Sequence, residues 1–219
     1  MKKLPWLWAW LWVSPLLHGE GGLTWDFLSG GAVTSPAIAP DGSILAGSSD
    51  LSLYSIDPAT GTQNWQHQAG GVVSAPAING SGMAFAAVRI RITSQSHSVN
   101  VIAIGSTTGT KAWEVSLGQA VSGGRISSPA IAPDGTLVVL GGNEIYALDP
   151  GDGSTKWRYD SSIFVSPPTI GADGTVYLSV YESGDNYKVI ALSGRTGQKS
   201  GSSTPSEPSG ISRPLQIIL

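Results

Sequence analysis

A nine-residue phrase that recurs along this chain constrains its fold more than any other feature. Its four copies are DPATGTQNW (57–65), GSTTGTKAW (105–113), DPGDGSTKW (149–157) and SGRTGQKSG (193–201), the last without the final Trp. Outside the first 22 residues, the tryptophans are Trp25, Trp65, Trp113 and Trp157, at intervals of 40, 48 and 44 residues. Regular spacing of this kind indicates one structural unit repeated along the chain.

Two further phrases occur between the tryptophans, always in the same order. The first is TSPAIAPDG (34–42), SAPAINGSG (74–82), SSPAIAPDG (127–135) and SPPTIGADG (166–174). The second is LYSIDP (53–58), VIAIGS (101–106), IYALDP (145–150) and VIALSG (189–194). The apolar runs are short and rich in β-branched residues, and turn-forming residues separate them, so the repeat predicts strands rather than helices.

Each unit contains four such strands, and units of 40 to 50 residues with several short strands are typical of propeller blades. We therefore predict an all-β protein, a β-propeller of four-stranded antiparallel blades. The predicted blades span residues 30–69, 70–117, 118–161 and 162–199. Asp-Gly pairs suit the connections, since Gly adopts positive φ at little cost, and Pro is expected at the start of each first strand.

The repeated phrase predicts the contact between blades. In it a turn precedes a strand whose Trp packs against the neighbouring blade, which gives one such contact per blade. The predicted structural docking residues are Trp25, Trp65, Trp113 and Trp157 together with Gly61, Gly109, Gly153 and Gly197.

These phrases resemble the pyrroloquinoline-quinone-like β-propeller repeat over roughly residues 24–199. The resemblance implies a radial array of antiparallel blades. The family includes quinoprotein alcohol dehydrogenases, which carry the quinone and a calcium ion. It also includes non-enzymatic propellers, among them an outer-membrane factor that assists β-barrel assembly. The repeat alone does not choose between these functions.

The number of units departs from the family pattern of about seven or eight blades. Three units are complete, and the fourth has Gly201 where Trp is expected. At the other end, TWDFLS (24–29) has the pattern of a last strand with no blade before it. That strand could complete the fourth blade and close a small ring, or the chain could be an open arc. We favour the open, incomplete propeller, which exposes blade edges through which the protein could self-associate.

The two ends of the chain have a different composition. Lys2 and Lys3 precede the apolar run LPWLWAWLWVSPLL, which is shorter than the ~20 residues that span a bilayer. We predict a signal peptide at 1–22, no membrane span after its cleavage, and an extracytoplasmic location, whether periplasmic, secreted or at the cell surface. Residues 200–219 are rich in Ser and Pro and are predicted to be a disordered tail.

No catalytic, cofactor-binding or metal-ligating residue can be assigned from the sequence. The chain has no Cys, which excludes thiolate catalysis and the adjacent-cysteine disulfide that many family enzymes use. Asp149 and Asp152 faintly resemble a calcium loop, but they lack the spaced carboxylates and closing Glu of one, so a plain turn is favoured. Asn143 and Glu144 could be oxygen ligands, although a turn between strands explains them as well.

The histidines and one insert complete the candidates. His18 lies in the leader, whereas His67 and His97 fall in different blades without metal-ligand spacing and are predicted to be surface residues. The insert VRIRITSQSHSVN (88–100) lengthens the second blade, and its Arg89 and Arg91 alternate with isoleucines. It could be a partner-binding edge, but we favour a long hairpin.

The function that these observations favour is a non-catalytic binding or scaffold module. Its partner, a protein or a small ligand, would bind at the blade loops. The alternative is a fragment of a quinone- and calcium-dependent dehydrogenase that is inactive alone. The net charge of −3 and the lack of a basic cluster argue against nucleic-acid binding.

Overall fold

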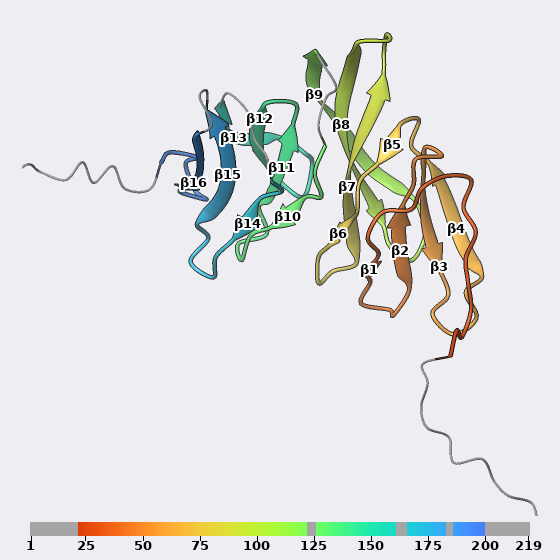
Figure 1. The fold of residues 1–219 in the computed structure, drawn as a ribbon. Helices are drawn as coiled ribbons and strands as arrows, with labels where there is room; N and C mark the ends of the chain where they lie inside the picture. Colours follow the sequence, from red (N-terminus) through yellow and green to blue (C-terminus); the bar gives the residue numbers. More distant parts are fainter. Residues whose placement is uncertain (1–21, 122–125, 161–165, 183–185, 200–219) are drawn as a thin grey trace, which may run out of the picture.

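The computed structural model describes residues 22–121, 126–160, 166–182 and 186–199. Within these residues every regular element is a β-strand, and the strands form four antiparallel sheets that follow one another along the chain (Figure 1). We number the sheets as blades 1 to 4. The predicted signal peptide, except Gly22, and the predicted tail lie outside the described residues.

The sheets follow the order of the sequence. Blade 1 contains β1 (Ala37–Ile38), β2 (Ile44–Gly47), β3 (Ser52–Ile56) and β4 (Gln63–Gln68), and blade 2 contains β5 (Val72–Val73), β6 (Ala77–Ile78), β7 (Met83–Arg91), β8 (Ser96–Gly105) and β9 (Lys111–Val121). Blade 3 contains β10 (Ala130–Ile131), β11 (Leu137–Gly141), β12 (Glu144–Leu148) and β13 (Thr155–Asp160), and blade 4 contains β14 (Thr169–Ile170), β15 (Val176–Glu182) and β16 (Asn186–Leu192).

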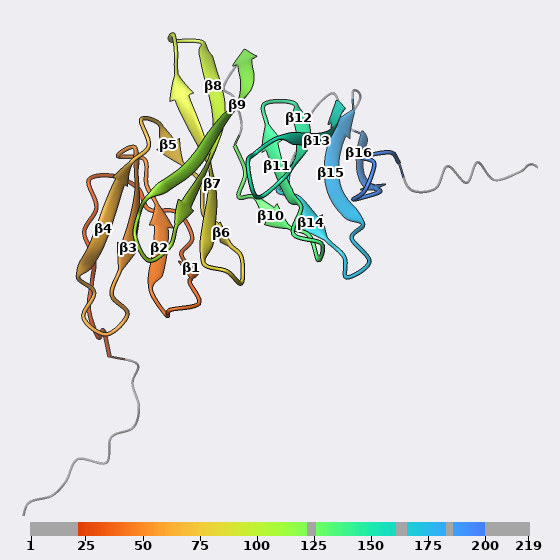
Figure 2. The same ribbon diagram turned by 180° about the vertical axis from the view of Figure 1, so that it is seen from behind.

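This arrangement confirms the predicted all-β, open propeller. Blades 1 and 4 lie at opposite ends of the array in two opposed views (Figure 1 and Figure 2), so these blades do not close a ring. The strand count differs from four in two blades. Blade 4 has three described strands, and beyond them Lys199 forms a single bridge to Leu192. Blade 2 has a fifth, β5, because its first strand is divided by Pro76.

Short turns rich in Gly set the register of each blade. In the turn between the first and second strands, the Gly42 amide donates to the Ala39 carbonyl at 2.8 Å, and Gly135 does the same to Ala132. Both glycines have positive φ, 87° and 86°, a backbone conformation that residues with a Cβ rarely adopt. The Asp41 carboxylate accepts hydrogen bonds from the Ser43 hydroxyl and amide, and these bonds lower the pKa of Asp41.

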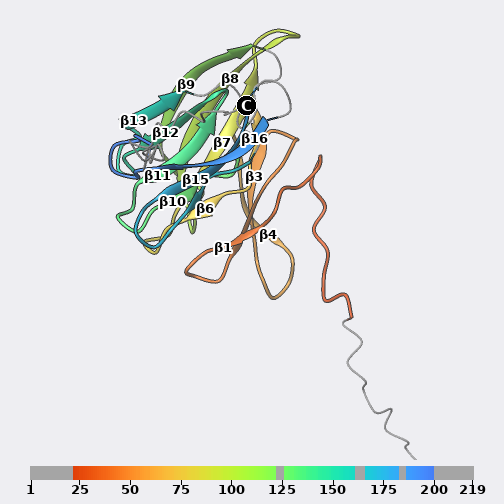
Figure 3. The same ribbon diagram turned by 60° about the vertical axis from the view of Figure 1, so that its left-hand side comes forward.

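The insert in blade 2 forms a long hairpin. Strands β7 and β8 pair continuously from Met83–Gly105 to Arg91–His97, and they extend beyond the strands of the other blades (Figure 3). The hairpin closes through backbone bonds from Ile92 and Thr93 to Ser96. The insert thus extends the sheet.

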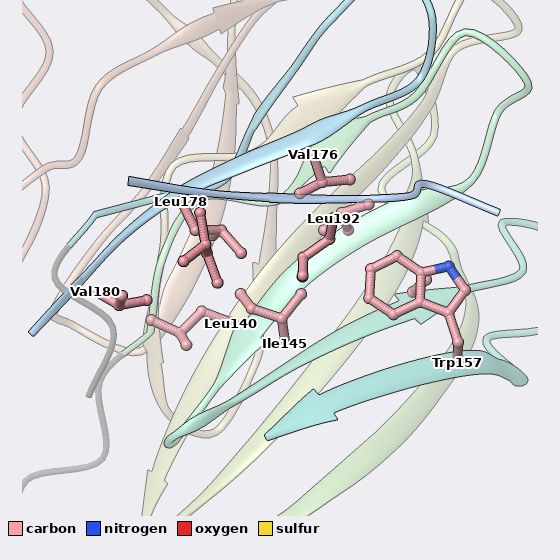
Figure 4. Packing of buried hydrophobic residues seen from close by; sticks show 10 residues of the cluster. Leu140, Ile145, Trp157, Val176, Leu178, Val180 and Leu192 are labelled. Atoms are coloured by element: carbon pink, nitrogen blue, oxygen red, sulfur yellow. The ribbon is translucent and has the colours of Figure 1, made fainter. Parts of the chain in front are cut away.

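The core lies between successive blades. Blade 3 presents Leu140, Ile145 and Trp157 to blade 4, which presents Val176 and Leu178 in return (Figure 4). Equivalent clusters join blade 2 to blade 3 and blade 1 to blade 2. Burial of these facing apolar surfaces is the main favourable term that holds one blade to the next.

A tryptophan contact recurs along the array, and we call it the docking contact. It combines packing of the Trp ring on a glycine with a hydrogen bond from the indole N–H. The ring of Trp65 lies against Gly109 of the next blade, so close that a Cβ on Gly109 would meet the ring at 2.7 Å. Its indole N–H donates to the Ser106 carbonyl at 2.8 Å. The same pair of interactions joins Trp25 to Gly61 and Pro58, Trp113 to Gly153 and Pro150, and Trp157 to Gly197 and Gly194.

A tight turn prepares the receiving side of the docking contact. The Gly109 amide donates to the Gly105 carbonyl at 2.9 Å, and the same five-residue turn ends at Gly61, Gly153 and Gly197. The four glycines have φ between 68° and 77°. Glycine is needed here for two independent reasons, the positive φ and the space that the ring occupies.

These two reasons can be separated by comparing Gly109→Ala with Gly42→Ala. Both positions have positive φ, but a Cβ on Gly42 meets nothing within 4 Å. We expect Gly42→Ala to lower the free energy of unfolding by about 1–2 kcal/mol. Gly109→Ala adds about 1–3 kcal/mol more from overpacking against Trp65. Urea unfolding followed by far-UV circular dichroism measures both. Equal losses in the two variants would show that the Trp65 ring does not depend on the space that glycine leaves at position 109.

Candidate functional site

A hollow of about 680 Å³ lies where the inner strands of all four blades begin, and we call it the axial hollow. Its lining is residues 33–35, 72–75, 126–128 and 166–167, with Arg89 and Leu140. The repeated sequence explains the convergence, because each lining segment immediately precedes or contains the same Pro-containing phrase. Equivalent positions from four blades therefore surround one space.

The hydroxyls of the lining have a structural task. Pro has no amide hydrogen, so the first strand cannot continue its ladder through Pro36, Pro76 or Pro168. Two residues before each Pro, a Ser or Thr hydroxyl accepts a hydrogen bond from the second strand. Thr34 accepts from the Gly47 amide at 3.1 Å, Ser74 from Ala87 at 3.0 Å and Ser166 from Ser179 at 3.0 Å.

The structure corrects the expected position of these prolines. Pro76 lies between β5 and β6, both of which pair with β7, so it interrupts the first strand instead of starting it. In blades 1 and 3, single bridges at Val33–Ser48 and Ile126–Gly141 take the place of β5. The Ser or Thr at the interruption was not recognised as a functional residue in the sequence, although its constant spacing of two residues before Pro was a visible signal.

Arg89 is the charged side chain of the axial hollow, and it also lines a second hollow of about 520 Å³ beneath the β7–β8 hairpin. We call this second space the side hollow. It contains Arg91, Ser94 and His97 as well. The Nδ1 atom of His97 is buried and has no hydrogen-bond partner among the described residues. Two guanidinium groups and an imidazole thus line one hollow, and these groups favour an anionic ligand.

Backbone strain accompanies the side hollow. Leu51, one of its lining residues, has φ of 73° and is the non-glycine residue with positive φ in the described part of the chain. A bulky residue in this conformation costs free energy, and such residues are concentrated at functional sites.

The other sequence candidates lie elsewhere. Asp149 and Asp152 accept hydrogen bonds within their own turn, from the Gly151 amide at 2.9 Å and the Ser154 amide at 2.8 Å. Hydrogen bonds from the Ser154 amide and side chain lower the pKa of Asp152. The docking tryptophans and glycines lie on the outer strands and turns, and none of them lines the axial hollow.

Asn143 and Glu144 line a small hollow of about 170 Å³ between blades 2 and 3. The Tyr146 hydroxyl lies within hydrogen-bonding reach of two acceptors, the Glu144 carboxylate and the Leu117 carbonyl, and can donate its single hydrogen to either. Burial and the neighbouring Glu144 carboxylate raise the pKa of Tyr146 to about 12. Glu144 also pairs with Arg158 at 3.5 Å.

The two histidines beyond the leader are half-buried. His67 is in β4, where burial and then the Lys111 charge lower its pKa, so its neutral form is favoured. His97 is in β8 and lines the side hollow, which sequence reasoning did not foresee. His18 lies outside the described residues.

The residues of the axial hollow do not fit a calcium ion and a quinone. Calcium takes six to eight oxygen ligands, usually with carboxylates, and the described lining contains no Asp or Glu and no aromatic ring to stack on a quinone. Among the described residues, no group of three or more His, Cys, Asp or Glu could hold a metal ion. A search of the same residues for a membrane-spanning helix found none.

The blades and their repeated phrases define a β-propeller of the pyrroloquinoline-quinone-like repeat class. A family model described as outer membrane protein assembly factor BamB matches residues 97–217, more than half of the 219-residue chain. The chain therefore belongs to this family, which confirms the resemblance seen in the repeated phrases. The comparison with curated proteins found no match.

Solved propellers superpose on the chain. BamB from Moraxella catarrhalis does so with a TM-score of 0.56 at 21% identity, over 76% of this chain and 47% of that one. Quinohemoprotein alcohol dehydrogenase from Comamonas testosteroni gives 0.60 at 17% identity, over 82% and 36%. The C-terminal WD40 domain of Sif2 gives 0.54 at 14%, over 76% and 48%. These likenesses show the fold, and the chain spans less than half the length of each.

The structural role of the lining hydroxyls can be tested at Ser74. Ser74→Ala leaves the fully buried Ala87 amide without its side-chain acceptor, so we expect a loss of about 1–3 kcal/mol in the free energy of unfolding. Ser74→Thr keeps a hydroxyl at this position, as Thr34 does in blade 1. We expect it to keep most of the free energy of unfolding that Ser74→Ala loses. Ser81→Ala, in an exposed turn, is the control and should change stability by less than about 0.5 kcal/mol. Thermal unfolding gives all three values. Indistinguishable behaviour of Ser74→Ala and Ser81→Ala would contradict this role.

Proposed function

We propose that this protein is a non-catalytic binding and scaffold module of the extracytoplasmic space. It holds an acidic segment of a partner protein in the axial hollow and the adjoining side hollow. The observation that carries the proposal is that Arg89 lines both the axial hollow, which all four blades build, and the side hollow, which Arg91 and His97 also line.

The lining supports binding of a peptide chain. Serine hydroxyls and the backbone of the interrupted strands supply neutral donors and acceptors along the axial hollow, where Ser35 and Ser128 are among the lining residues. Such groups recognise a peptide backbone of any sequence, whereas the guanidinium groups select for carboxylates. The rigid strands beneath the rim hold these groups in place without a large ordering cost.

Local charge supports an acidic ligand. The protein as a whole is acidic, with a net charge of −3, and it contains 12 Lys and Arg residues. Two of these 12 line one hollow whose described lining contains no carboxylate. A cleft with this charge attracts anions over several ångströms and raises their association rate.

The family supports a scaffold role. Its description names an outer membrane protein assembly factor, and BamB from Moraxella catarrhalis shares the fold. A function in assembling other proteins requires a surface that holds unfolded or partly folded segments, and an extended hollow with backbone-like polar groups fits such segments. The dehydrogenase alternative has no comparable support in the hollow, since its lining does not suit calcium or a quinone.

The binding proposal is tested with a fluorescein-labelled, glutamate-rich peptide and a glutamine-rich peptide of the same length. We expect fluorescence anisotropy to show preferential binding of the glutamate-rich peptide. Arg89→Gln/Arg91→Gln should weaken it about tenfold or more, or about 1.4 kcal/mol. The control, Arg158→Gln/Arg195→Gln, removes the same charge outside both hollows and should leave affinity within about twofold. Equal weakening by both pairs, or no preference between peptides, would overturn the proposal.

The extracytoplasmic location is supported by Lys2, Lys3 and the apolar run that follows them. We expect the protein recovered from the periplasm or medium to begin at Leu23, as read by N-terminal sequencing. Lys2→Glu/Lys3→Glu should reduce the exported fraction, because the charged region of a secretory signal is positive. An exported protein that begins at Met1 would contradict a cleaved signal.

A further inference from the structure

Blade 4 exposes an apolar face that the other three blades bury. One position of the second strand and one of the third, counted from the turns, can be compared across the four blades. In blades 1 to 4 the residues at these two positions are Leu45 and Leu53, Phe85 and Val101, Val138 and Ile145, and Tyr177 and Val189. The first three pairs are 0–1% exposed, because the following blade covers them, whereas Tyr177 is 42% and Val189 70% exposed. Tyr187, 69% exposed, lies on the same face against Tyr181. This face has the character of an interface without its partner.

The other end of the array carries the complementary piece. Trp25 docks on Gly61 and Pro58 of blade 1, in the manner of the other docking contacts. Two residues later, Phe27 packs edge-on against Tyr54 with ring centroids 5.1 Å apart. Val115 and Tyr159 occupy the corresponding places two residues after Trp113 and Trp157, in the clusters with the next blade.

Residues 24–29 therefore lie on blade 1 as the last strand of a preceding blade would, but no described strand pairs with them. Leu28, within this segment, is 87% exposed. Blade 4 has the opposite deficiency, since the outer edge of β16 is paired among the described residues at the Leu192–Lys199 bridge alone. An unpaired edge beside an uncovered apolar face is a template for strand addition.

The two ends cannot meet within one chain, because blades 1 and 4 lie at opposite ends of the array (Figure 1 and Figure 2). The shapes of the two ends indicate what covers blade 4, since residues 24–29 lie on blade 1 in the manner of the last strand that blade 4 lacks among the described residues. We propose that a second copy of this chain covers blade 4. Its residues 24–29 add to β16 as a fourth strand, and two copies joined head to tail at both ends close one propeller. A head-to-tail contact forms a closed particle only when the rotation between successive copies returns to the first copy.

The register of the new pairing follows from the complete blades. In them the docking Trp lies opposite a small residue of the third strand, Ser55, Ala103 or Ala147. The equivalent in blade 4 is Ala191, which places Trp25 of the second copy opposite it. Three residues away, Gln68 faces Ser52 and Asp160 faces Glu144, so Leu28 of the second copy faces Lys188. This inference is independent of what the axial hollow binds.

The first test is the particle mass of the full chain, measured by sedimentation equilibrium and compared with the mass of one chain from mass spectrometry. We expect two chains per particle. Val189→Glu puts a charge into the covered face and should weaken association at least a hundredfold, which gives single chains. Ile92→Glu is the matched control, because Ile92 is also exposed, at 47%, but lies in the β7–β8 hairpin. Single chains for the unchanged protein at every concentration, or equal effects of the two variants, would overturn the proposal.

The second test does not depend on how Val189→Glu folds. The chain has no Cys, so Leu28→Cys/Lys188→Cys introduces a single pair that can be oxidised. Residues directly opposite in a ladder have Cα separations within the range of a disulfide. We expect covalent two-chain particles on a non-reducing gel, and no cross-link from Leu28→Cys/Ile92→Cys. A disulfide within one chain would overturn the proposal in favour of a closed four-bladed ring. A ladder of longer products would overturn it in favour of an open filament.

Discussion

The contact between an indole ring and the glycine of the next blade is the interaction on which the rest of the structure depends. Each blade is a small sheet with too little surface to be stable alone, so the blades must be joined. The docking contact joins two blades through close packing of a ring and through a hydrogen bond. The Trp113 ring fills the place where Gly153 lacks a Cβ, and its N–H satisfies the Pro150 carbonyl. Because the same geometry recurs at every junction, each blade is set at a similar angle to the one before.

The angle between blades determines what lies at the axis. Inner strands are short and are interrupted by Pro36, Pro76 and Pro168, so the blades converge without crowding, and Ser or Thr hydroxyls replace the missing ladder bonds. This leaves the axial hollow lined by groups that hold the frame together. In the function proposed above, recognition falls to the blade with the long β7–β8 hairpin, because β7 brings Arg89 to the axial hollow and Arg91 to the side hollow. The residues that hold the strands together are thus different from the charged residues that are proposed to bind a partner, although both belong to the same blades.

The junction geometry also accounts for the ends. A blade presents one face that receives a docking Trp and one face that provides it, and every junction uses both. At the first blade the receiving face is occupied by Trp25 and Phe27. At the fourth blade the providing face carries Tyr177 and Val189, and no other blade of the described part of the chain covers them. The open array is thus asymmetric, and its two ends match each other in the way that successive blades do.

The sequence by itself determined the repeat, the strands and the junctions, because Trp, Gly and Asp-Gly turns act over a few residues and recur at fixed spacing. It did not reveal that Arg89 borders one space with strand starts from all four blades, or that His97 lines the side hollow next to it. That proximity depends on the angle between sheets, and no single segment of the sequence determines this angle. The sequence favoured an open array over a closed ring, but it did not settle the choice, since both use the same local contacts. The tertiary structure decided this, because four blades set at these angles leave the ends apart.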